Sequence, residues 1–118
     1  MARKQATIKN EIVKQMKTLG IYKPEYKNVI TIFAGMLSQY EHFEEEFIEK
    51  GYPIEEEYTN KAGATNMRKT PLLSCMEKLR MDIATYSNIL CLNPKSLENV
   101  TAEKANKSKL ANMLSEMK

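Results

Sequence analysis

The strongest constraint on the fold is a pair of long apolar stripes separated by a segment rich in turn-forming residues. The second stripe steps by four, three, four, three and four residues, the heptad spacing of a helix that packs along another helix. Its members are Leu72, Met76, Leu79, Ile83, Tyr86 and Leu90. The first stripe repeats at three and four residues and predicts a helix over residues 24–50, a rod of about 40 Å. Two such helices are expected to fold back on each other as an antiparallel helical hairpin.

The segment between the stripes carries the signals that would close this hairpin. Three consecutive glutamates at residues 55–57 are interpreted as a charged loop. Residues 58–67 follow and are interpreted as a turn or short β-hairpin centred near Gly63. Thr70 then caps the second long helix, and Pro71 fits its first position.

The two ends of the chain add shorter helical elements. Helically spaced apolar residues in segment 1–23 are followed by Gly20, a C-terminal stop signal. These residues are Ile8, Ile12, Val13, Met16 and Leu19. Apolar residues are sparser after residue 92, so segment 93–118 is expected to form short helices or a tail. The prediction is an all-α chain with a turn or β-hairpin tip. It consists of a basic N-terminal helical segment (1–23), a helical-hairpin oligomerisation core (24–92) and this C-terminal segment.

The hairpin core is also expected to bind other copies of itself. A two-helix hairpin buries little surface, so it has a thin margin of stability as a monomer. Apolar residues also lie off the main stripes, where either a second subunit or the N-terminal helix could cover them: Ile32, Leu73, Met81 and Ile89. The interface candidates, which packing inside the hairpin would use as well, are Phe33, Leu37, Tyr40, Leu79, Ile83 and Tyr86.

The net charge of +3 hides a division of charge along the chain. Both ends are basic, whereas residues 28–58 contain eight glutamates and a single basic residue, Lys50. Basic ends favour contact with a polyanion such as DNA, and the alternative is that these lysines are ordinary solvated helix faces. The first candidates for phosphate contact are Arg3, Lys4, Lys9, Lys14 and Lys17, and the second are Arg68 and Lys69. No helix rich in base-reading side chains stands out, so direct base readout is not assigned.

No set of residues predicts catalysis. His42 is the only histidine and is interpreted as a solvent-facing side chain, and neither cysteine has metal-ligand spacing. The glutamates of residues 41–49 share an exposed helix surface, whereas acid–base catalysis needs a partly dry pocket that shifts pKa values. We therefore expect no enzyme activity, no cofactor and no metal.

The chain also lacks the signals of membrane insertion and export. It has no apolar run of about 18 residues, and its basic start is not followed by the apolar core of a secretion signal. An intracellular protein without a membrane partner is expected.

Several weak motifs occur in an informative order. A long helix ending in glutamates precedes the turn YTNKAG at residues 58–63, then the proline-led heptad helix, then LCLNPKS at residues 90–96. This order, over about residues 22–100, resembles the small terminase subunits of tailed bacteriophages. Those proteins show a similar tyrosine-threonine-asparagine and glycine turn, a proline-led helix and a leucine-threonine-proline-serine element. One departure is Thr70-Pro71, where the family commonly has asparagine-proline.

The resemblance implies a role in viral genome packaging in the cytoplasm of the bacterial host. Such subunits form homo-oligomeric rings, bind the packaging site of double-stranded viral DNA and present it to the large terminase subunit. The large subunit supplies the ATPase and the nuclease. Two alternatives are a helical oligomeric adaptor that does not bind DNA and a small DNA-binding transcriptional regulator. The chain shows no compact helix-turn-helix pattern, which counts against the regulator.

Overall fold

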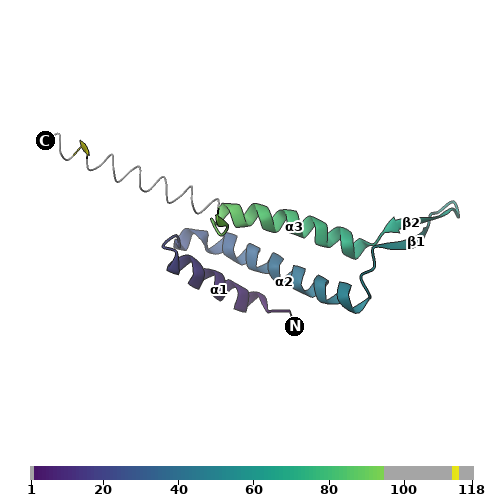
Figure 1. Ribbon diagram of the computed structural model, residues 1–118, viewed down its shortest axis with the longest axis horizontal. Coiled ribbons are helices and arrows are strands. Elements are labelled where there is room, and N and C mark those ends of the chain that lie inside the picture. The colour runs from purple at the N-terminus through teal and green to yellow at the C-terminus, as the bar shows by residue number, and fades with distance from the viewer. Residues whose placement is uncertain (1, 95–112, 115–118) are drawn as a thin grey trace.

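The computed structural model describes residues 2–94 and 113–114. The elements along the chain are α1 (Gln5–Thr18), a 3₁₀ turn (Pro24–Tyr26), α2 (Lys27–Glu49), β1 (Glu55–Thr59), β2 (Thr65–Lys69) and α3 (Pro71–Ile89). Figure 1 shows α2 lying between α1 and α3, with the β1–β2 hairpin projecting beyond the helices. The described chain is mostly helical with a small antiparallel sheet at its tip, as the sequence predicts. The short helices expected in segment 93–118 lie almost entirely outside the described residues.

The core lies where α1 packs against α2 and the end of α3. Its buried side chains are Ile8, Ile12, Met16, Ile30, Phe33, Ala34 and Leu90. The three residues from α1 are spaced by four, so they form one stripe along the helix. Burying an aliphatic or aromatic side chain of this size stabilises a protein by about 1.5–3 kcal/mol. This small cluster therefore holds the helical body together.

The heptad stripe of α3 faces α2. Met76 and Leu90 are buried, and the other four members of the stripe are half-buried. Arg80 also joins the two helices, because its Nε donates a hydrogen bond of 2.8 Å to the hydroxyl of Tyr40. The predicted packing stripe is therefore present, although it is less deeply buried than the α1–α2 core.

Thr70 connects the hairpin to α3. Its side chain accepts a hydrogen bond from the backbone N–H of Leu73 at 3.3 Å, which is the predicted N-cap. The same hydroxyl donates to the carbonyl of Pro53 at 2.8 Å, and the Thr70 N–H donates to the carbonyl of Ile54 at 3.0 Å. Thr70 is also the only buried polar residue among the described residues. One side chain thus starts a helix and closes the base of the hairpin.

Two predicted element boundaries are wrong. Residues 55–57 are not a loop, because they form most of β1 and pair with residues 67–69 of β2. Cross-strand attraction stabilises a glutamate-rich strand here, since Arg68 is paired with Glu56. The first turn of the long helix is 3₁₀ rather than α, so α2 begins at Lys27 instead of residue 24.

The tip of the hairpin is built by Asn60 and Gly63. The Oδ1 of Asn60 accepts hydrogen bonds from the N–H groups of Ala62 and Ala64, both at 3.0 Å. Gly63 has a φ of 87°, a conformation that strains residues with a Cβ atom. These two residues explain why the chain reverses at this point.

Candidate nucleic-acid interface

The basic side chains of α1 lie on more than one side of the helix. Lys14 and Lys17 are exposed, and their spacing of three places them close together on the helix surface. Because Ile8, Ile12 and Met16 define the buried stripe, helical geometry places this pair on the side away from the core. Two neighbouring ammonium groups on an outer helix can contact the phosphates of a DNA backbone.

The other lysines near α1 flank this pair. Lys4 is exposed and immediately precedes the helix, whereas Lys9 is half-buried. The Nζ of Lys17 also lies 5.2 Å from the centre of the Tyr22 ring, a cation–π contact that orients its side chain. The structure therefore brings Lys14 and Lys17 together and leaves the remaining candidates at the margins.

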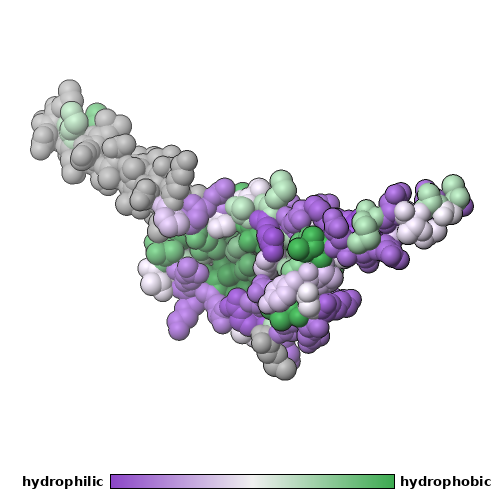
Figure 2. Space-filling view, turned by 45° about the vertical axis from the view of Figure 1, so that its right-hand side comes forward, coloured by the Kyte–Doolittle hydropathy of each residue, from purple (hydrophilic) through white to green (hydrophobic). Residues whose placement is uncertain are grey.

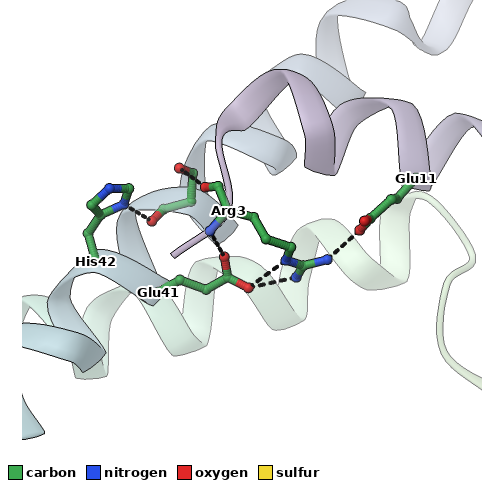
Figure 3. A network of polar contacts seen from close by, with 5 residues as sticks. Arg3, Glu11, Glu41 and His42 are labelled. Carbon is green, nitrogen blue, oxygen red and sulfur yellow. Dashed lines mark hydrogen bonds and ion pairs between the residues drawn. The ribbon is translucent and has the colours of Figure 1, made fainter. Parts of the chain in front are cut away.

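Arg3 is already bound by carboxylates of its own chain (Figure 3). Its Nε and Nη2 donate to Glu41 Oε1 at 2.9 and 2.7 Å, and its backbone N–H donates to Glu41 Oε2 at 3.0 Å. Its Nη1 contacts Glu11. The hydroxyl of Ser38 donates to the Arg3 carbonyl at 2.9 Å, which completes the attachment of the N-terminal segment to α2.

These contacts shift the pKa values of both Arg3 and Glu41. The hydrogen bonds from Arg3 lower the pKa of Glu41, and the same pairing raises the pKa of Arg3. Both groups therefore stay ionised and largely neutralise each other. Arg3 contributes less positive charge to a DNA surface than the sequence suggests, and it has a clear role in docking the N-terminal segment.

Arg68 and Lys69 lie on β2, at the opposite end of the helical body from α1 (Figure 1). The Nη2 of Arg68 donates to Glu56 Oε1 at 2.8 Å, and its guanidinium lies 4.3 Å from the centre of the Tyr58 ring. The Nζ of Lys69 donates to Glu77 of α3 at 2.9 Å. The structure does not join these two residues to the α1 lysines in one surface.

An acidic surface lies beside Arg3. Ala2, Glu41, Glu44, Glu45 and Ile48 line a shallow hollow there. His42 on the same helix is exposed, with its Nδ1 2.7 Å from the carbonyl of Ser38. Within residues 2–94 and 113–114, no three histidine, cysteine or acidic side chains are grouped to hold a metal ion. A negative surface repels phosphates, so this part of α2 is less suited to a polyanion than the lysine-bearing side of α1.

The six interface candidates all take part in packing within the chain. Phe33 is 5% exposed in the core, and the other five are half-buried. By contrast Ile32, Met81 and Ile89 are 51%, 73% and 59% exposed, so α1 does not cover them. Met67 of the hairpin is also 58% exposed, and its burial could not be judged from the sequence because the strand was interpreted only as part of a turn. The described chain therefore leaves several large apolar side chains in contact with solvent.

Within its described part, the chain is a small helical protein with a lysine pair on an outer helix and several exposed apolar side chains. A family model for the small subunit of phage terminase matches residues 8–107, and the chain belongs to this family. No curated protein and no solved structure matches it. The family has a role in phage DNA packaging and is generally non-catalytic, because the large subunit holds the ATPase and nuclease. No helix in the described part of the chain is both long and apolar enough to span a membrane.

Proposed function

We propose that this protein binds the packaging site of double-stranded phage DNA and presents it to the large terminase subunit in the host cytoplasm. The observation that carries the proposal is the family match over residues 8–107, which covers α1 from Ile8 onward, both long helices and the hairpin. In this role the protein does no chemistry itself and acts by positioning DNA.

The outer side of α1 is the proposed DNA contact. Lys14 and Lys17 are its centre, with Lys4 and Lys9 on its flanks and Arg3 contributing least because of its carboxylate partners. Arg68 and Lys69 are secondary contacts, since each already has an acidic partner. Lysine–phosphate contacts position a protein on DNA with little sequence information, so binding should be salt-sensitive and only weakly sequence-specific.

The proposed active form is a ring of several copies. Exposed apolar residues, notably Ile32, Met81 and Ile89, provide surface for a neighbour to cover. The half-buried members of the candidate interface would extend this contact: Leu37, Tyr40, Leu79, Ile83 and Tyr86. Several copies would also present several lysine pairs to one DNA molecule, which strengthens weak individual contacts.

The decisive experiment compares DNA binding by the wild type and the K14E/K17E variant, using fluorescence anisotropy of a labelled duplex over a range of salt concentrations. Loss of two phosphate contacts per bound subunit should weaken binding and reduce the slope of log K against log salt by about 2 for each subunit that contacts the DNA. The K61E/K78E variant, in which two other exposed lysines carry the same charge change, should bind like the wild type. Equal binding by wild type and K14E/K17E would remove α1 as the contact. Absence of binding by an oligomeric wild type would instead favour the adaptor function.

A further inference from the structure

Four polar side chains form a straight line along the outer side of α1. Thr7, Asn10, Lys14 and Lys17 follow one another at spacings of three, four and three residues, which keeps them on one side of a helix. All four are exposed, and we refer to them as the outer stripe. Asn10 lies two residues from Ile8 and two from Ile12, a rotation of about 200° in either direction. The outer stripe is therefore opposite the buried stripe of α1.

The side-chain amide of Asn10 has no hydrogen-bond partner among the described residues. Other amides of the chain take part in the fold. The Nε2 of Gln5 donates to the carbonyl of Thr31 at 2.9 Å, and the Oδ1 of Asn60 accepts two hydrogen bonds in the hairpin turn. An asparagine amide carries donor hydrogens beside an acceptor oxygen. Asn10 thus presents a donor and an acceptor side by side to solvent.

The shape of the molecule leaves the outer stripe accessible to a large partner. Figure 1 shows α1 on one side of α2 and α3 on the other, so α3 does not cover α1. α1 has 14 residues and is about 21 Å long. The major groove of B-form DNA is about 12 Å wide and accepts an α-helix, whereas the minor groove, at about 6 Å, does not.

The charges around Asn10 favour the approach of DNA. Lys14 and Lys17 continue the outer stripe toward the end of the helix, and their long flexible stems can reach phosphates at the edge of a groove. Glu11 is the only acidic residue of α1, and its carboxylate contacts the guanidinium of Arg3. The short side chain of Asn10 can contact only a group directly beneath the helix, which in a groove is the edge of a base.

We propose that α1 enters the major groove along its outer stripe and that Asn10 recognises an adenine. Its Nδ2 would donate to adenine N7, and its Oδ1 would accept a hydrogen bond from the N6 amino group. Adenine is the base that presents an acceptor and a donor side by side in this groove, so it matches the amide. The inference rests on the proposed DNA binding and adds a base contact to the phosphate contacts. One such contact gives a preference at a single base pair, in agreement with weak overall specificity.

Selection from a pool of duplexes with a randomised centre tests this assignment in the full chain. Bound duplexes are sequenced for the wild type and for Asn10→Ala. The wild type should enrich a position occupied by adenine, with other bases bound roughly five- to 150-fold more weakly there. Asn10→Ala should lose the preference at that position and keep the salt-dependent affinity for unselected DNA. Alanine is the better helix former, so this variant is expected to keep α1 folded.

Two further variants separate base recognition from a general effect of the substitution. Asn10→Gln keeps the amide, and glutamine can also form a bidentate contact with adenine, so part of the preference should return. Asn66→Ala removes the same side chain from an exposed position on β2 and should select the same sequences as the wild type. Figure 2 shows the hairpin that contains β2 extending from the body at its right-hand side.

Replacing the selected adenine by 7-deazaadenine tests the groove and the atom. This base keeps its Watson–Crick pairing and lacks the N7 acceptor in the major groove. Wild-type binding should become several-fold weaker on the modified duplex, because the contact from Asn10 Nδ2 is lost. Asn10→Ala should bind the modified and unmodified duplexes equally. Fluorescence anisotropy with both duplexes and both proteins measures the coupling between Asn10 and N7.

Three results would overturn the inference: a wild type that binds DNA without any base preference, an Asn10→Ala variant that keeps the wild-type preference, or equal wild-type binding to the modified and unmodified duplexes. Each of them leaves the proposed DNA binding intact. The K14E/K17E titration on unselected DNA tests that binding separately. A wild type that binds no DNA would overturn the proposed function and this inference together.

Discussion

The helical body and the β-hairpin are held together in different ways. In the body, buried side chains of α1 and α2 such as Ile8, Met16 and Ile30 exclude water almost completely. In the hairpin, order comes from the Asn60–Gly63 turn and from charge pairs on an exposed surface. Apolar burial is a strong stabiliser that charge screening does not weaken, whereas exposed ion pairs contribute little and are screened by salt. The body is therefore expected to resist unfolding more strongly than the hairpin.

The largest effect on stability is expected from a substitution in the core of the helical body. Phe33→Ala should lower the free energy of unfolding by about 3–5 kcal/mol, because it leaves a cavity between α1 and α2. Urea unfolding followed by circular dichroism measures the loss. Met67→Ala in the hairpin is the matched comparison and should change the stability of the dissociated chain by less than about 0.5 kcal/mol. Similar losses for both variants would contradict the difference between the two regions.

The next largest effect on stability is expected at Thr70, where the hairpin joins the helical body. Thr70→Ala removes the N-cap of α3 and the bond to the Pro53 carbonyl, which should cost about 1–2 kcal/mol. Hydrogen exchange should also become faster in β1 and β2, because the base of the hairpin is no longer tied. Thr70→Ser keeps the hydroxyl and should behave nearly like the wild type. If Thr70→Ser were as unstable as Thr70→Ala, packing of the methyl group rather than the hydroxyl would explain the effect.

A smaller effect on stability is expected from a substitution in the turn at the tip of the hairpin. Gly63→Ala places a Cβ at a φ of 87° with nothing within 4 Å of it, so backbone strain of about 1 kcal/mol is the main effect. Exchange of the β1 and β2 amides should become faster while that of α1 and α2 amides stays unchanged. Gly63→Asn should be milder, since asparagine tolerates this conformation better. Faster exchange in α1 as well would show that hairpin and body unfold together.

The smallest effect concerns the docking of the N-terminal segment. Arg3 lowers the folded-state pKa of Glu41 below its unfolded value, so the pair contributes stability above the unfolded pKa. That contribution is lost as the pH falls through the lowered pKa of Glu41. Both side chains are partly exposed, so it should be below about 1 kcal/mol.

Unfolding of wild type and Glu41→Gln between pH 3 and 7 measures this contribution. The wild type should be more stable near neutral pH, and the two curves should converge in acid. Glu49→Gln changes an exposed glutamate of the same helix and should follow the wild type throughout. A constant difference between wild type and Glu41→Gln at every pH would rule out the ion pair as its cause.

Periodicity predicted the helices because their burial repeats along the sequence. The α3 stripe from Leu72 to Leu90 and the α1 stripe through Ile8, Ile12 and Met16 both face α2. Thr70-Pro71 also predicted a helix start correctly, because N-capping joins residues that are close together in the sequence. The strand at residues 55–57 was not predicted, because glutamate has a low strand propensity and the facing positions of Arg68 and Lys69 are set only in the folded hairpin.

The basic residues show a similar limit to what can be predicted from the sequence. Counting charges along the chain predicted Arg3 as a DNA contact but could not show its acidic partner Glu41, which is 38 residues away in sequence. Lys14 and Lys17 could be paired from their spacing alone, since both are on one helix. Which basic residues are neutralised within the chain depends on tertiary contacts, and neither composition nor periodicity reports these.

The most direct test of the account is the mass of the wild type at low salt with a duplex DNA, measured by chromatography with combined light-scattering, absorbance and refractive-index detection. One run reports the protein mass and the DNA mass in each peak. The account predicts an oligomer of more than two 13.6 kDa chains that elutes together with the duplex. A monomer that elutes apart from the DNA would contradict both the assembly and the DNA contact.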